Sequence, residues 1–174
     1  MAEHPKRPLY LMVKPTADAL LQLACQRAAL GIDAGSYSLD RLHSTFVRLG
    51  ETSPATLDLA RLALDGLHAE PFPIGFDSVD GNLLKGCKGL SALNAFQRRL
   101  ANHMLARGCP VIAHNFWLHL CLTYTDPVPV RRLRIAPISW TVEEIQLIES
   151  VHGQGRHVTH GRWRLAARQG SFVF

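Results

Sequence analysis

Residues 42–50 of the chain read LHSTFVRLG, a short run that follows a polar segment and ends at a glycine. Its composition is typical of a β-strand, in which successive side chains point to opposite faces of the sheet. On this pattern His43 and Thr45 face one side, while Ser44 and Phe46 face the other. An imidazole beside a hydroxyl can transfer a proton and hold an anionic oxygen. The sequence therefore predicts a functional strand at this position.

A second run, HLCLTY at residues 119–124, has the same organisation. Here His119, Cys121 and Thr123 share one face of the predicted strand. The two histidines are 76 residues apart, and each lies near the middle of one half of the 174-residue chain. This spacing predicts two similar lobes, each of which contributes one histidine strand to a shared cleft.

Composition is that of an ordinary globular protein, with 47% apolar and 19% charged residues. We expect a single bilobal domain over residues 1–174 and a monomer. No apolar run approaches the roughly 20 residues of a membrane span, and the N-terminal residues lack the apolar core of a secretory signal, so we expect a cytoplasmic protein without membrane association. The four cysteines form no C-x-x-C pair, which favours free thiols and predicts no zinc site.

Charge is biased toward the C-terminal third, which holds many of the arginines behind the net charge of +5. A basic surface favours partners that carry phosphate groups. The alternative is that this charge serves only solubility. The motifs, and not the charge alone, have to decide between the two.

Strands and helices are mixed without the strict alternation of a parallel α/β fold, which indicates an α+β architecture with largely antiparallel sheets. Helices are predicted from residue 15 to about 30, from the Ser53-Pro54 start to about 67, and from 91 to 108. Strands are predicted at residues 9–13, 41–49, 71–79, 82–84, 117–124, 132–138, 158–165 and 171–174, with another within 140–151.

The HSTF and HLCL tetrapeptides resemble the paired H-x-[ST]-x motifs of the 2′-5′ RNA ligase and 2H phosphoesterase family. The later segments Ile145-x-Leu147-Ile148-x-Ser150 and Trp163-x-Leu165 are similar to the closing part of that family. The resemblance covers about residues 8–166. It departs from the family pattern at Cys121, where a hydroxyl residue is usual.

This resemblance implies a bilobal α+β fold with two pseudo-symmetric antiparallel sheets, outer helices and a central groove. It implies that His43 and His119 are catalytic and face each other, and that Thr45 and Cys121 contact the phosphate. It also implies activity on 2′,3′-cyclic phosphates or 2′-5′ linkages of RNA ends or small nucleotides, with no metal and no cofactor.

Elementary chemistry agrees with the leading hypothesis, a metal-independent 2′,3′-cyclic phosphodiesterase. Water needs a base and the departing ribose oxygen needs an acid, and two imidazoles can fill both roles. The alternatives are a 2′-5′ RNA ligase and a non-catalytic RNA- or nucleotide-binding protein of the same fold.

Several neighbouring side chains carry secondary predictions. The thiol of Cys121 donates less well than a hydroxyl, so Thr123 is an alternative phosphate contact. The basic residue that often follows each family motif is missing, and strict alternation puts Arg48 on the face opposite His43. Phe46 is predicted to pack in the core and Tyr124 to be exposed. His114, His152, His157 and His160 lack the spacing of a zinc site and are predicted to be solvated in loops.

Overall fold

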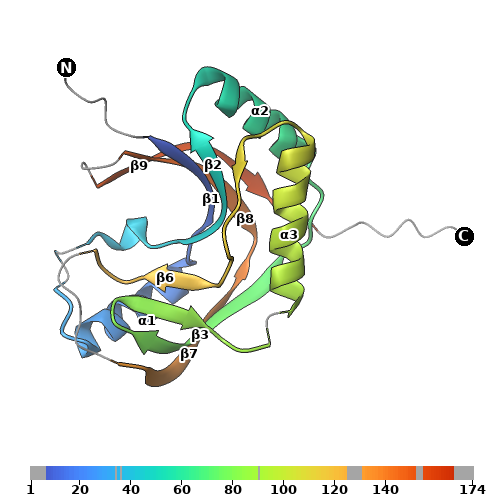
Figure 1. Cartoon of the computed structure of the whole chain (residues 1–174). Coiled ribbons are helices and arrows are strands. Elements are labelled where there is room, and N and C mark those ends of the chain that lie inside the picture. The colour runs from blue at the N-terminus through green and yellow to red at the C-terminus, as the bar shows by residue number, and fades with distance from the viewer. Residues whose placement is uncertain are drawn as a thin grey trace, which may run out of the picture.

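Two antiparallel sheets form the frame of the molecule in the computed structural model, which describes residues 7–33, 35, 37–89, 91–124, 131–151 and 155–166 (Figure 1). The five-stranded sheet has the order β5 (Val111–Ile112), β2 (Ser44–Glu51), β1 (Pro8–Val13), β8 (Glu144–Val151) and β9 (Arg156–Arg164). The four-stranded sheet has the order β6 (His119–Cys121), β4 (Leu83–Gly86), β3 (Phe72–Asp80) and β7 (Leu133–Val142). The predicted α+β architecture with two antiparallel sheets is confirmed.

Three α-helices and one short 3-10 turn complete the described fold: α1 (Ala17–Ala29), α2 (Pro54–Asp65), α3 (Ser91–Ala106) and η1 (Leu39–Arg41). The predicted helix starts are confirmed. The Thr16 hydroxyl accepts from the Ala19 N–H at 3.3 Å, and the Ser53 hydroxyl accepts from the Thr56 N–H at 3.1 Å. These side chains satisfy backbone donors that the first turn of a helix leaves unpaired.

Helices α1 and α3 each pack against the sheet that does not precede them in the chain (Figure 1). Helix α1 follows β1 of the five-stranded sheet but packs against β7 of the four-stranded one. Helix α3 follows β4 of the four-stranded sheet but packs against β2, beside α2. One hydrophobic core therefore serves both lobes.

Some predicted boundaries are wrong. His43 precedes β2 rather than lying within it, and β6 holds only three of the residues predicted for the second histidine strand. The predicted 140–151 segment is divided, because β7 continues to Val142 and β8 begins at Glu144. The strands predicted at 71–79 and 82–84 pair as the hairpin of β3 and β4, and Gly81 occupies its turn with φ of 58°. The strand predicted at residues 171–174 lies outside the described residues.

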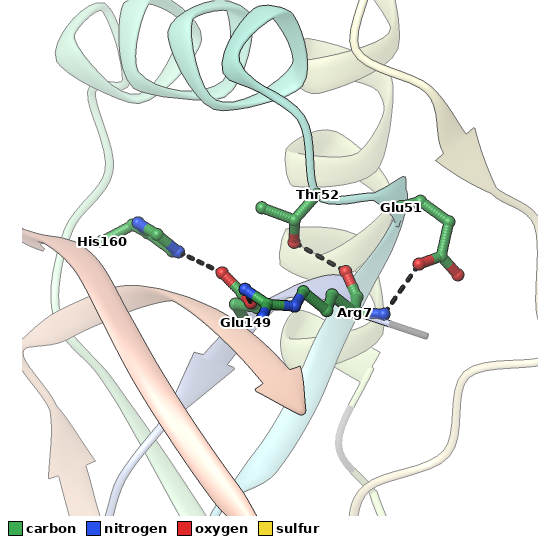
Figure 2. A network of polar contacts seen from close by, with 5 residues as sticks. All are labelled: Arg7, Glu51, Thr52, Glu149 and His160. Atoms are coloured by element: carbon green, nitrogen blue, oxygen red, sulfur yellow. Dashed lines mark hydrogen bonds and ion pairs between the residues drawn. The ribbon is translucent and has the colours of Figure 1, made fainter. Parts of the chain in front are cut away.

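A polar network fastens the beginning of β1 to three other strands (Figure 2). The buried carboxylate of Glu149 on β8 pairs with Arg7 at 3.2 Å and with His160 on β9 at 2.8 Å. The Arg7 backbone N–H donates to Glu51 at 2.8 Å, and the Thr52 hydroxyl donates to the Arg7 carbonyl at 2.6 Å. His160 is thus a hydrogen-bonded strand residue, and the prediction of a solvated loop position is wrong for it.

The helices in the described part of the chain are all too short or too polar to cross a membrane.

Candidate functional site

A cavity of about 680 Å³ collects residues from both sheets. His43 and Thr45 reach it from the beginning of β2, and His119 reaches it from β6. Tyr124, just beyond β6, also lines it. Both predicted histidines therefore lie on the wall of one cavity, together with the hydroxyl residue of the first motif.

Both histidines are held by the same backbone contact. The Nδ1 atom of His43 lies 2.7 Å from the carbonyl oxygen of Arg41, and that of His119 lies 3.0 Å from the carbonyl oxygen of Trp117. In each case the carbonyl belongs to the residue two positions earlier. A carbonyl only accepts, so Nδ1 carries the hydrogen and Nε2 of the neutral ring is left to accept a proton.

One hydrogen bond joins the two motifs directly. The hydroxyl of Ser44 donates to the carbonyl oxygen of His119 at 2.7 Å. Ser44 is only 1% exposed, so this bond is shielded from water. Strand alternation predicts that Ser44 faces away from the cavity. On that face, its hydroxyl links the first motif to the second.

His43 lies in a shielded and positively charged environment. Burial lowers its pKa to about 4, and the charges of Lys14, His119 and Arg41 act in the same direction. The hydrogen bond with the Arg41 carbonyl acts in the opposite direction but is the weaker effect. At neutral pH the His43 ring is therefore unprotonated.

A third histidine shares this part of the cavity. The ring of His157 on β9 meets the His43 ring edge to face, with 5.0 Å between centroids. Burial and then the charge of His43 lower the pKa of His157 to about 4. The predicted solvated loop position is wrong for His157, because β9 pairs it with Ser150 of β8, and both residues line the cavity.

His119 has a more open setting. Its ring stacks on the indole of Trp117 with 4.1 Å between centroids and 25° between planes. Trp117 is 45% exposed, and the ammonium group of Lys85 lies 5.9 Å from its ring centroid. The imidazole of the second motif is therefore stacked on an aromatic side chain that is itself partly exposed.

A β-bulge changes which residues of β2 face the cavity. Leu11 of β1 lies opposite Val47, but Met12 lies opposite Thr45, so Phe46 has no partner of its own. Phe46 and Val47 are both fully buried, which resets the alternation. The prediction that Arg48 faces away from the cavity is wrong, because the bulge returns it to the side of Thr45 and it lines the cavity. The predicted core position of Phe46 is confirmed.

Cys121 shares the cavity side of β6 with His119, since the intervening Leu120 is fully buried. Its thiol donates to the Thr123 carbonyl at 3.0 Å, burial raises the pKa of that thiol, and Cys121 is not among the described residues that line the cavity. Thr123 is 1% exposed, which leaves its hydroxyl out of reach of a ligand. Tyr124 is 64% exposed, as predicted, and it also lines the cavity.

Sequence reasoning missed Arg41 as a cavity residue, and it misplaced Arg48 and His157. For Arg41 a signal existed, because it is only two positions before His43 in the sequence. For the other two the decisive features are a bulge and a strand pairing, which single-sequence alternation does not report. Across the described ranges, no three His, Cys, Asp or Glu side chains come together as a metal site.

The comparison with solved structures identifies the fold class as that of LigT, a protein of the 2H phosphoesterase and 2′-5′ RNA ligase family. Escherichia coli LigT complexed with 3′-AMP matches with a TM-score of 0.74 and 21% identity over 94% of this chain and 100% of that one. A structure described as a phosphoesterase matches at 0.71 and 20%, over 94% and 100%. The protein TT0787 of Thermus thermophilus matches at 0.71 and 17%, over 92% and 99%. No family model and no curated protein sequence matches the chain.

Proposed function

We propose that the protein is a metal-independent phosphodiesterase that opens 2′,3′-cyclic phosphates of RNA ends or small nucleotides. The observation that carries this proposal is the pair of imidazoles on one cavity, His43 and His119, each with Nδ1 bound to a carbonyl and Nε2 left for chemistry. The fold of LigT, whose structures include complexes with 3′-AMP, ATP and NADP+, supports a nucleotide as the ligand.

The two histidines take different roles in this mechanism. His43, unprotonated at neutral pH, accepts a proton from the attacking water as the new oxygen–phosphorus bond forms. His119, in its protonated form, donates to the ribose oxygen as its bond to phosphorus breaks. The product is a nucleotide with a 2′- or 3′-phosphate monoester, and the pair of histidines exchanges its protonation states in each turnover.

Thr45 is proposed to donate to a non-bridging phosphate oxygen as negative charge develops. Cys121 is proposed as the corresponding contact in the second motif, since it is two residues beyond His119 on the same side of β6. A thiol is a weak donor, so this side of the phosphate is held less strongly. The same groups support the runner-up activity, 2′-5′ ligation, when a 5′-hydroxyl replaces water as the nucleophile and a ribose oxygen of the cyclic phosphate leaves. In the reverse reaction, cleavage of the 2′-5′ linkage, the 5′-oxygen is the leaving group.

The test is turnover of adenosine 2′,3′-cyclic monophosphate by the purified chain in the presence of EDTA. We expect conversion to a 2′- or 3′-phosphate that a variant lacking both His43 and His119 does not perform. Joining of RNA ends without cyclic phosphate hydrolysis would favour the ligase. Nucleotide binding without either reaction would favour the non-catalytic alternative, and activity that EDTA removes and zinc restores would defeat the mechanism.

A further inference from the structure

Arg41 places a positive charge on the cavity wall. Its side chain forms no ion pair with any residue that the structure describes. Within the same described residues, its buried Nε atom has no hydrogen-bond partner. An unpaired buried donor costs free energy, and a charged one costs more. The guanidinium group thus has binding capacity that the described part of the chain does not use.

The surroundings fix this guanidinium in place. Its central carbon lies 4.3 Å from the centroid of the Tyr37 ring, and the Tyr37 hydroxyl donates to the Arg41 carbonyl at 3.3 Å. Tyr37 in turn meets Tyr124 edge to face at 5.0 Å. On another side lies Gly155, where an added Cβ would come within 2.9 Å of Nη1. The guanidinium group of Arg41 is therefore held in position by its contacts with the Tyr37 ring and with the backbone at Gly155.

The charged groups around Arg41 favour the binding of an anion. The charge of Arg41 lowers the pKa of both His43 and His157, and Lys14 does the same. Asp40 is the acidic residue that opposes this charge near Lys14 and His157, and its carboxylate accepts from the Ser38 hydroxyl. A phosphate in the cavity would offset this excess of positive charge.

We propose that Arg41 is the main phosphate-binding residue of the cavity, and that its planar N–H groups hold non-bridging oxygens of the nucleotide phosphate. Guanidinium groups suit this role because they donate several hydrogen bonds in a fixed plane. The assignment of the phosphate as the one that reacts rests on the proposed function. Arg41 then contributes twice, since its carbonyl orients the His43 ring and its side chain draws the phosphate toward that ring.

The test measures binding and does not depend on turnover. Calorimetric titrations with adenosine 3′-monophosphate and with inorganic phosphate compare the unchanged chain with Arg41→Ala, Arg41→Lys and Arg98→Ala. Arg98 is exposed on α3, so its replacement removes the same charge at a distance from the cavity. We expect roughly 10- to 100-fold weaker binding for Arg41→Ala, the value of charge-assisted hydrogen bonds. The affinity of Arg41→Lys should lie between that of the unchanged chain and that of Arg41→Ala. Arg98→Ala should bind both ligands as tightly as the unchanged chain.

A rescue variant separates a specific contact from damage to the cavity. Tyr124 and Arg41 both contact the Tyr37 ring and both line the cavity, so an arginine at position 124 starts close to the site that Arg41 occupies. The double variant Arg41→Ala/Tyr124→Arg should regain part of the lost affinity for both ligands. Circular dichroism and thermal unfolding check that each variant is folded, and Arg41→Lys remains informative if Arg41→Ala is not.

The outcomes distinguish this inference from the proposed function. Loss of phosphate binding in Arg41→Ala, in a chain that turns over no cyclic nucleotide, would support Arg41 as the anion site and reject the enzyme. Full turnover and unchanged binding in both Arg41 variants would support the enzyme and overturn the role of Arg41. Equal losses of affinity in Arg41→Ala and Arg98→Ala would also overturn the role of Arg41, because the change in net charge alone would then explain the effect.

Discussion

The two histidine motifs share a backbone design but differ in everything that surrounds them. In both, Nδ1 of the imidazole binds the carbonyl two residues earlier. His43 is then enclosed by Lys14, Arg41 and His157, whereas His119 stacks on the half-exposed ring of Trp117. The first motif also keeps its hydroxyl residue, and the second has a cysteine there.

This difference between the motifs suits the asymmetric reaction that we propose. A base has to be unprotonated before the reaction begins, and the burial that lowers the pKa of His43 supplies that condition. An acid needs access to protons between turnovers, and His119 lies on the more open side of the cavity. The mechanism therefore does not need two identical motifs, and the variants below test each side against the other.

Removal of either imidazole should have the largest effect. His43→Ala and His119→Ala should each lower the turnover of adenosine 2′,3′-cyclic monophosphate by roughly 100-fold or more, the usual contribution of acid–base groups. His68→Ala is the matched control, because His68 lies outside the cavity. Steady-state rates of turnover at pH 7 test this prediction. A small decrease for one of the two variants would show that its histidine is not an acid or base of the mechanism.

The next effect concerns the hydroxyl of the first motif. Thr45→Val keeps the shape of the side chain but removes its donor, so kcat should fall by roughly 10-fold or more. Cys121→Thr places a stronger donor at the corresponding position of the second motif and should retain or raise kcat. Folded Cys121→Thr protein without activity would show that position 121 does not match position 45.

The bond between the motifs should affect both stability and catalysis. Ser44→Ala leaves the His119 carbonyl without its buried donor, which we expect to cost about 1–3 kcal/mol of unfolding free energy. Urea unfolding measures this loss. Ser53→Ala removes the N-terminal cap of α2 and should cost about 1 kcal/mol while leaving kcat unchanged. An equally unchanged kcat in Ser44→Ala would show that the bond does not position His119.

The smallest effect is a shift in the pH profile. Protonated His43 cannot act as a base, so kcat/KM should fall as the pH drops through about 4. Lys14 carries one of the charges that lower the pKa of His43, so Lys14→Met should move this acidic limb to higher pH. Lys88→Met is the control, since Lys88 is exposed. A limb that moves to lower pH, or not at all, would contradict the electrostatic account of the first motif.

Local sequence signals predicted much of this frame. The Ser53 cap predicted the start of α2, and alternation placed Thr45 on the cavity and Phe46 in the core. Such signals work because capping and alternation depend on neighbours within a few residues.

The features that failed depend on contacts between distant segments. The bulge at Phe46 is a property of two strands, so the position of Arg48 could not be read from one. His157 reaches the cavity because β9 pairs with β8 in one particular register. The excess of positive charge near Arg41 arises only when η1, β2 and β9 come together. The closeness of Arg41 to His43, in contrast, could be predicted from the sequence.

Each sheet combines strands from both halves of the chain, which has a consequence for how the chain assembles. A cut between β4 and α3, near Lys88, would leave one fragment with β1 and β2 and the other with β5, β8 and β9 of the same sheet. Neither fragment would hold a complete sheet, so each should remain unfolded alone and the two should fold only when mixed. The histidine motifs would lie on different fragments, and catalytic activity would then report fragment association directly.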